Sequence, residues 1–340
     1  MTKLNNLFPI IQSEKEVLSK IDSDPLLAAV FRSWPEKRQR EFLNICTGMK
    51  GHRILYDVYF KYVFNAQTHP EHLKGLLESL LDRKIDSLEV MDLQSALIAE
   101  AHPLMVLDIL VRLDDGAIVN VEIQKIGYKF PGQRAACYSA DLVLRQYARL
   151  KKEDKKAYYG DMNPVYTVVL IEESTLEFHE HDAYIHHFTQ QTDTGLTLPL
   201  LQEYYFVPLD NFREAMHNKS MKERTRLEAW LTFLTAEEPD EINSFVLAFP
   251  EFKEIYLNLY MLCRNVEGAM KMFSEQLSIL DRNTTTLMID ELRDEVKAEK
   301  SRADAAKKEA EAAREDACLK QKRIEELEKT LQKLYMNQPE

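Results

Sequence analysis

Two acidic residues and a glutamine occupy neighbouring apolar segments of the chain. Asp108 is the one charged residue within the run LMVLDILV at 104–111, and Glu122 and Gln124 alternate with β-branched residues in the next segment. A lone carboxylate in an apolar strand is costly unless a partner compensates its charge. Hard divalent cations prefer carboxylate oxygens, and such a cation polarises a phosphoryl oxygen for hydrolysis. A bound cation is therefore one partner that could compensate the charge of Asp108 and, where the strands bring them together, of Glu122.

Whether the two carboxylates meet depends on the hairpin turn between their strands, the Asp-Asp-Gly sequence at 114–116. With a three-residue loop whose glycine is left-handed, Leu113 pairs with Ala117. The same register sets Asp108 opposite Glu122 on one face of the hairpin. A two-residue loop would send the carboxylates to opposite faces. The longer loop is predicted because it satisfies both the apolar and the polar alternation.

The elements that must position these residues follow from hydrophobic periodicity and turn signals. The order is α-β-β-β-α-β, an α/β core. Its predicted elements are a helix from Glu71, strands at Leu88–Leu93, Leu104–Leu113 and Ala117–Lys125, a helix at Phe130–Leu150 and a buried strand at Val165–Ile171.

Additions are predicted on both sides of this core. Residues 1–50 form a helical lead-in of two or three short helices, 51–215 the core, 216–285 a helical region and 286–335 a long helix that forms a coiled coil. The coiled coil is predicted because apolar residues recur at alternating steps of three and four residues, interrupted only by Glu299 and Lys320. These seam residues are Leu292, Val296, Ala303, Ala306, Ala310, Ala313, Ala317, Ile324, Leu327, Leu331 and Leu334. A homodimer through this helix is expected, with a single solvated helix as the alternative.

The composition of the chain argues against several other classes of protein. The 340 residues carry a formal net charge of -12, so contact with nucleic acid must be local, and bound cations would reverse the field around their carboxylates. The four cysteines form no Cys-x-x-Cys pair, which argues against zinc and disulfide frameworks. The apolar runs are too short to span a membrane, and the first residues do not resemble a secretion signal. A soluble, cytoplasmic protein is expected.

Four stretches, in this order and spacing, resemble the recombination-promoting nuclease / putative transposase family, a branch of the PD-(D/E)XK nucleases with a restriction-endonuclease-like core. The similarity covers roughly residues 52–215 and is carried by DVYFKYVFN, VLDILVRLDDGAIVNVEIQ, QRAACYSADLVLRQY and NPVYTVVLI. It implies a metal-dependent DNA endonuclease linked to recombination or mobile elements, in which Asp108 and Glu122 bind Mg²⁺ or Mn²⁺ and Gln124 orients the attacking water by hydrogen bonds. Asp108 matches the motif aspartate, Glu122 the D/E position and Gln124 the last position, which is lysine in the general motif and glutamine in this branch.

The same resemblance singles out four further residues. Asp57 matches the acidic residue that opens the family pattern, and it either lies near the metal or caps a helix. Gln133, Arg134 and Tyr138 resemble the family's helix beside the active site, where Arg134 would contact a phosphate.

Other interpretations of the candidate residues stay open. Asp108 and Glu122 could form a structural network inside an ordinary sheet. The core could also be a catalytically inactive module that binds DNA or a protein partner. A cluster of histidines could hold a transition metal, although surface histidines are the more common case. These are His179, His181, His186 and His187.

Overall fold

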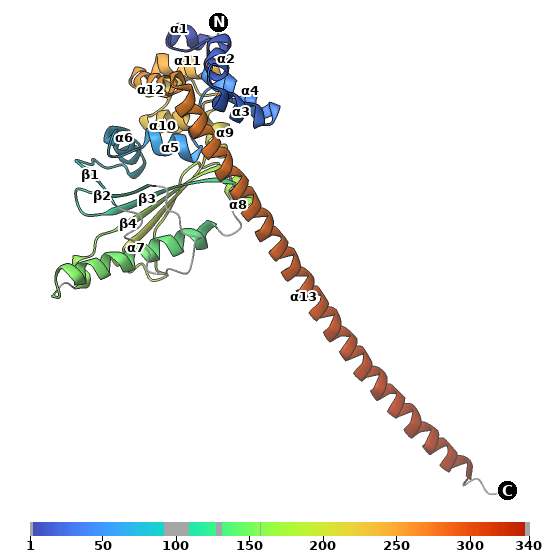
Figure 1. Ribbon diagram of the computed structural model, residues 1–340. Helices are drawn as coiled ribbons and strands as arrows, with labels where there is room; N and C mark the ends of the chain where they lie inside the picture. Colours follow the sequence, from blue (N-terminus) through green and yellow to red (C-terminus); the bar gives the residue numbers. More distant parts are fainter. Residues whose placement is uncertain (1–2, 92–108, 127–130, 157, 337–340) are drawn as a thin grey trace. The chain divides into compact units, whose positions relative to one another are not determined.

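The structure is a computed structural model that describes residues 3–91, 109–126, 131–156 and 158–336 (Figure 1). The chain divides into two compact units, Met1–Leu277 and Ser278–Glu340. The predicted division into four parts remains a prediction.

Six described strands of the first unit form one mixed sheet in the order β1-β2-β3-β4-β6-β5. β2 is antiparallel to both β1 and β3, β4 is parallel to both β3 and β6, and β5 at the edge is antiparallel to β6. Their bounds are Leu88–Val90 (β1), Ile109–Leu113 (β2), Ile118–Ile126 (β3), Val165–Glu173 (β4), His186–Phe188 (β5) and Gln202–Pro208 (β6). The predicted order α-β-β-β-α-β is confirmed by α6, β1, β2, β3, α7 and β4, and the mixed α/β architecture agrees with a PD-(D/E)XK fold.

The hairpin between β2 and β3 has the predicted three-residue loop. The Leu113 N–H donates to the Ala117 carbonyl over 2.8 Å, and Gly116 has a φ of 86°, the left-handed conformation that glycine adopts without steric cost. Farther along the hairpin Ile109 pairs with Val121. The register predicted from the alternation of side chains is therefore confirmed throughout the described part of the hairpin.

Helices cover both faces of the sheet. The long helix α7 lies on one face, whereas α5, α6, α9 and α10 lie on the other (Figure 1). The bounds in this part of the chain are Asp57–Val63 (α5), Pro70–Leu81 (α6), Pro131–Glu153 (α7), Tyr159–Asp161 (η1), Leu176–His179 (α8), Leu209–Met216 (α9), Met221–Glu223 (η2) and Arg226–Thr235 (α10). Under α7 the sheet contributes Leu110, Ile118 and Val165 to an apolar cluster with Tyr138 and Leu142.

The N-terminal segment contains four described helices, where two or three were predicted. They are Lys3–Leu7 (α1), Glu14–Asp22 (α2), Pro25–Ser33 (α3) and Glu36–Cys46 (α4). The side chains of Ser13 and Glu16 form a capping box that starts α2. The apolar faces of α2, α3 and α4 pack against residues from much later in the chain, including Cys263, Met270 and Phe273.

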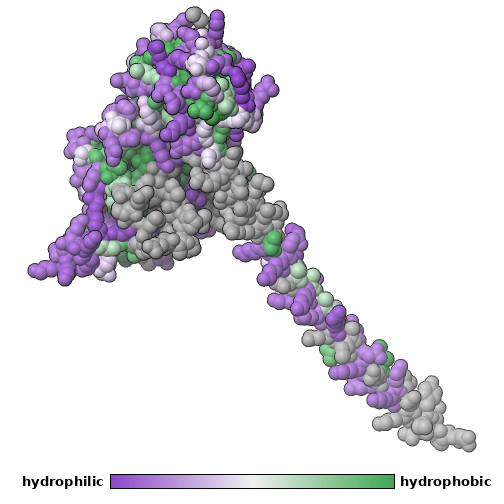
Figure 2. All heavy atoms as spheres, in the orientation of Figure 1, coloured by the Kyte–Doolittle hydropathy of each residue, from purple (hydrophilic) through white to green (hydrophobic). Residues whose placement is uncertain are grey.

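The C-terminal part is helical, as predicted from Arg224 onward. It comprises Pro239–Ala248 (α11), Pro250–Phe252 (η3), Lys253–Arg264 (α12) and Val266–Met336 (α13). The last helix begins earlier than the predicted tail, because Val266, Met270 and Phe273 are core residues of the first unit. Along the second unit hydrophilic side chains predominate, with isolated apolar ones between them (Figure 2). Among the described residues, none of the helices combines the length and apolar character needed to cross a membrane.

Candidate active site

Three polar side chains form a row along β3 on the face that α7 covers. Asn120, Glu122 and Gln124 are 0, 3 and 2 % exposed, and the period of two in a strand places all three on one side of the sheet. The Asn120 amide donates to Glu122 Oε1 over 2.9 Å. The next strand presents Val169 and Ile171 to the same face, in a cluster with α7. The polar face predicted for this strand is therefore present, and Glu122 lies on it opposite the apolar Val169.

The amide of Gln124 lacks hydrogen-bond partners within the described part of the chain. Neither its Oε1 nor its Nε2 is bonded, and the same holds for Asn120 Oδ1 and for Thr167 Oγ1, directly across from Asn120 on β4. A buried polar atom left without a partner costs about 1–3 kcal/mol. Native proteins rarely leave such atoms unbonded without a functional reason. Oxygen atoms of this kind beside a buried carboxylate fit the ligands that a hard cation and its water molecules need.

Asp108, the other predicted metal ligand, lies outside the described residues. β2 begins at Ile109, the residue after it, and Ile109 pairs with Val121, the residue before Glu122. The meeting of the two carboxylates therefore stays a prediction.

The residues predicted beside the site have different surroundings. Tyr138 of α7 is buried in the apolar cluster over β2, β3 and β4, and the Arg134 guanidinium lies 5.3 Å from its ring centroid. Gln133 is exposed on the same helix. Asp57 is the first residue of α5 and forms an ion pair with Lys61 at 2.9 Å, in the helical turn where a carboxylate is favoured by the helix dipole.

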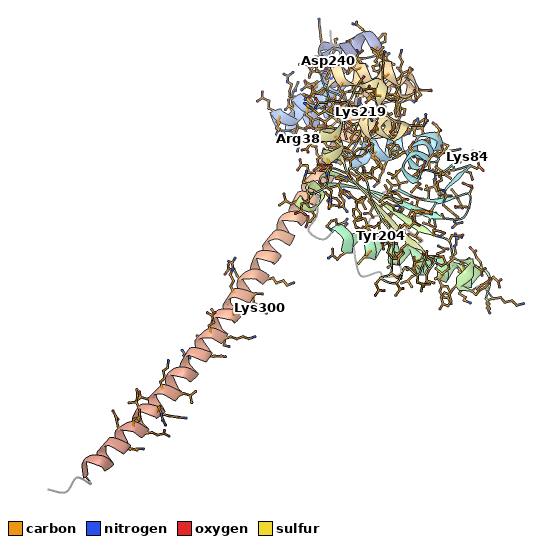
Figure 3. All side chains as sticks on the ribbon, turned by 180° about the vertical axis from the view of Figure 1, so that it is seen from behind. Arg38, Lys84, Tyr204, Lys219, Asp240 and Lys300 are labelled. Carbon is orange, nitrogen blue, oxygen red and sulfur yellow. The ribbon has the colours of Figure 1, made fainter. Side chains whose placement is uncertain are left out.

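A cavity of about 570 Å³ lies over the part of the sheet that α7 and α8 border. Its wall includes Tyr204, which lies close to α7 in Figure 3, and Phe206, which packs with Ile171 in the cluster beneath α7. The wall also includes Phe178, His181 and His186. Because neighbouring strands are about 4.8 Å apart, the cavity lies roughly two strand spacings from the polar row of β3.

The four clustered histidines do not converge on one point. His179 Nε2 lies 3.3 Å from Asp210, and His187 lies 2.8 Å from Glu203 and stacks on Tyr205. The remaining two rings, His181 and His186, are in an edge contact at 5.8 Å. Ordinary surface and ring contacts therefore account for this cluster.

Lys125 follows the E-x-Q motif directly and cannot take the place of the motif lysine on the Glu122 face. It points to the other face, where its Nζ lies 3.6 Å from the ring centroid of Tyr56. Burial lowers the pKa of Lys125 to about 8, and the opposing effect of the Glu172 carboxylate is smaller. The alternation of the strand could have indicated this placement, but the burial depends on Tyr56 and Glu172, which are distant in sequence.

The low pKa of Lys125 predicts a pH-dependent stability. An unfolded lysine holds its proton up to about pH 10.4, whereas folded Lys125 loses it near pH 8, so between these values the unfolded chain binds more protons. The free energy of unfolding should therefore gain a contribution that rises with pH across this window. Thermal melting at several pH values should show this contribution in the wild type and not in Lys125→Met. A difference between the two proteins that stays constant with pH would contradict it.

The comparisons with known proteins agree with this geometry. Residues 54–288 match the family described as PD-(D/E)XK nuclease family transposase, and this match spans more than half of the chain. The protein therefore belongs to the PD-(D/E)XK nuclease family transposases, as its sequence motifs predict. No curated protein and no solved structure matches it. Family membership suggests a hydrolase that acts on DNA with the help of a divalent metal.

Proposed function

We propose that the protein is a metal-dependent DNA endonuclease that hydrolyses phosphodiester bonds and serves recombination or mobile elements. The observation that supports it most is the buried row on β3, in which the Glu122 carboxylate lies beside the unpartnered amide of Gln124. An ordinary structural network would satisfy its own polar atoms. Among the described residues, the Gln124 amide and the Asn120 Oδ1 instead have no hydrogen-bond partner, so these atoms are available to a ligand.

The roles of the residues follow from their chemistry. Glu122 and Asp108 would hold Mg²⁺ or Mn²⁺, which when bound polarises the phosphoryl oxygen and lowers the pKa of a water molecule. The carboxamide of Gln124 has both a donor and an acceptor, so it orients the attacking water but cannot take its proton as a base. Asn120 holds the Glu122 carboxylate through its own amide, which fixes the rotamer of the metal ligand.

The discriminating experiment is cleavage of supercoiled plasmid with Mg²⁺, with Mn²⁺ and with a chelator, beside an Asp108→Ala variant. We expect nicked or linear product with either metal, none with the chelator and none from the variant. If the wild type binds DNA without cutting it under any metal, the inactive binding module is the correct function. If it neither binds nor cuts, both functions are wrong.

We further propose that the tail of α13 is a coiled coil that joins two copies of the chain. The predicted seam residues Val296, Ile324 and Leu327 are exposed, and their step pattern suits an identical helix. The alanine-rich middle of the seam buries little apolar area per turn, so the association should be weak and should depend on concentration. A dimer would also supply two sites, one for each strand of a duplex.

Sedimentation of the full chain beside a chain that ends at Asp290 tests the tail. The full chain should shift from monomer toward dimer mass at about tens of micromolar, and the shortened chain should remain monomeric. A double variant, Ile324→Glu with Leu327→Glu, should also be monomeric, because it places charges in the seam. Leu319→Glu is the matched control, since Leu319 is exposed but lies off the seam. If the full and the shortened chain both sediment as monomers, the coiled-coil proposal is wrong and the tail is a single solvated helix.

A further inference from the structure

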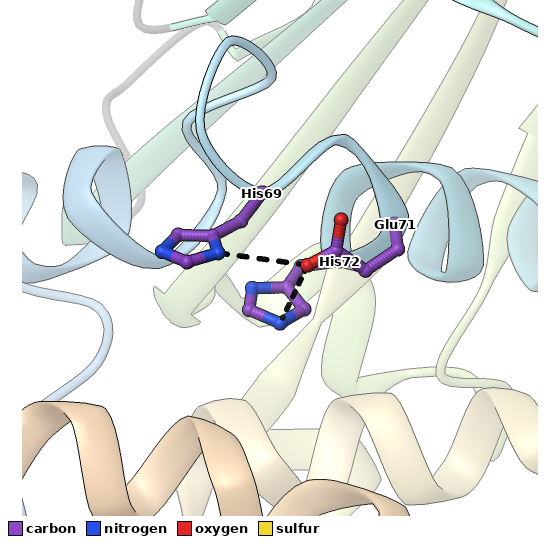
Figure 4. Close-up of side chains that lie close together, drawn as sticks. All are labelled: His69, Glu71 and His72. Carbon is purple, nitrogen blue, oxygen red and sulfur yellow. Dashed lines mark ion pairs between the residues drawn. The ribbon is translucent and has the colours of Figure 1, made fainter.

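The start of α6 carries a group of side chains that neither the motif nor the family match uses. His69, Glu71 and His72 each offer a ligand atom, and these atoms all lie within 4.8 Å of one another (Figure 4). In the part of the chain that the structure describes, no other group of three His, Cys, Asp or Glu residues converges in this way. We propose that these three residues bind a transition-metal ion of the zinc type. The proposal is independent of the nuclease site on β3.

The spacing of the ligand atoms suits a tetrahedral ion. Metal–nitrogen and metal–oxygen bonds of about 2.0–2.1 Å imply ligand atoms about 3.3–3.4 Å apart in a tetrahedron. Glu71 Oε1 lies 3.5 Å from His69 Nδ1 and 3.4 Å from His72 Nε2. Two edges of the tetrahedron are thus already present. Only the separation of the two imidazole nitrogens, at most 4.8 Å, has to shorten when the ion binds.

The ring of His72 is held in the form that a metal requires. Its Nδ1 lies 2.8 Å from the Val63 carbonyl, which can only accept a hydrogen bond, so Nδ1 carries the proton and Nε2 presents its lone pair. A backbone carbonyl in this role is the usual support of a metal-bound histidine.

The surroundings leave room for a fourth ligand and supply negative charge. The three residues border a cavity of about 230 Å³ that is also lined by Glu251 and Glu254. The one cation in its wall, Arg226, lies 3.6 Å from Glu251, so its charge is compensated. Glu254, at the start of α12, acts electrostatically on His72. A water molecule can complete the coordination.

A metal here would join the α5–α6 connection to the first turn of α6. Two imidazoles and a carboxylate favour zinc, nickel or copper over magnesium, because nitrogen ligands are softer than oxygen ligands. An ion that binds only the folded chain stabilises it by mass action. The site is therefore expected to be structural, and its loss should not remove the metal that serves the β3 site.

The test uses the full chain without a polyhistidine tag, freed of metal by chelation and titrated with Co²⁺ as a spectroscopic substitute for zinc. We expect one equivalent to bind with the visible absorption of a tetrahedral centre, and Zn²⁺ to displace it and raise the melting temperature. His69→Ala and Glu71→Gln change side chains that are at least partly exposed, so both variants should fold. Each should weaken Co²⁺ binding by about 100-fold or more, because losing a ligand should cost at least as much affinity as losing a residue that supports a ligand.

Two controls separate this site from the alternatives. A His181→Ala/His186→Ala variant removes two imidazoles that contact each other at another place in the first unit, and it should bind Co²⁺ as the wild type does. Glu122→Gln should likewise retain the absorption even though it loses the predicted nuclease activity. The proposal is overturned if the wild type shows no tetrahedral Co²⁺ spectrum. It is equally overturned if His69→Ala and Glu71→Gln bind Co²⁺ with unchanged affinity.

Discussion

Glu122→Gln is expected to reduce metal-dependent DNA cleavage by roughly 10²–10³-fold or more, the order of loss found when one preorganised electrostatic contact is removed from an active site. The substitution keeps the shape of the side chain and the oxygen that accepts from Asn120, so the fold should persist. What it removes is the negative charge that holds the cation. The rate of plasmid nicking under single-turnover conditions measures the effect.

Two further variants make this result specific. Gln124→Ala should cut about 10²-fold more slowly and yet bind Mn²⁺ as the wild type does, because only carboxylates are assigned to the metal. Glu89→Gln is the matched control. It makes the same change at Glu89 of β1, an exposed residue that forms an ion pair with Arg112 of β2, and this variant should cut DNA normally. Undiminished cutting by Glu122→Gln would refute the assignment of Glu122, and lost Mn²⁺ binding in Gln124→Ala would refute the division of roles.

The second large effect concerns stability and centres on Glu228 in the first turn of α10. This carboxylate is buried, yet it accepts hydrogen bonds from Lys219 Nζ, from the Tyr184 hydroxyl and from the Thr225 N–H. Lys219 lies in the helical part of the first unit (Figure 3). Lys219→Met would leave the buried charge without its cation, at a cost of about 2–3 kcal/mol, which lies below the range for fully buried pairs because Lys219 is partly exposed.

The same pair makes a pH-dependent prediction. Burial raises the pKa of Glu228, but the hydrogen bonds outweigh it, led by the one from Lys219, so the pKa lies below its usual value. This stabilisation is present above the ordinary glutamate pKa of about 4.3 and is lost as the pH falls through the lower folded value. Thermal melting of Lys219→Met should show a melting temperature lower by about 5 °C or more at pH 7, and the difference should shrink in acid.

Lys222→Met provides the comparison for this experiment, since it removes an exposed lysine three residues away. It should melt within about one degree of the wild type, as most surface substitutions do. If Lys219→Met and Lys222→Met had the same melting temperature, the claim that Lys219 stabilises the buried Glu228 carboxylate would be wrong.

The local parts of the fold could be predicted from sequence because short-range patterns determine them. The alternation along β3 identified its polar face, and the Asp-Asp-Gly turn determined the hairpin register that Leu113 and Ala117 confirm. Family motifs in the same segments pointed to Glu122 and Gln124.

The parts of the fold and of the candidate site that were not predicted depend on contacts between segments that lie far apart in the sequence. Thr167 joins the polar row only through the parallel pairing of β3 with β4, so its place beside Asn120 was not predicted. The metal-ligand group at His69, Glu71 and His72 was also missed, although its H-x-E-H spacing at a helix start was a signal. The early start of α13 was missed for the same reason, since Phe273 packs against residues of the N-terminal helices.

That packing has a consequence for how the protein is made. Besides packing against one another, the apolar faces of α2, α3 and α4 contact residues between Cys263 and Phe273, more than 200 residues later in the chain. At synthesis rates of about 5–20 residues per second, the parts of these faces that contact the later segment stay uncovered for roughly 10–45 s after they leave the ribosome. Contacts so distant in sequence also close slowly. The first helices are therefore expected to be bound by chaperones during translation, and the first unit is expected to become protease-resistant only after α13 has begun to emerge.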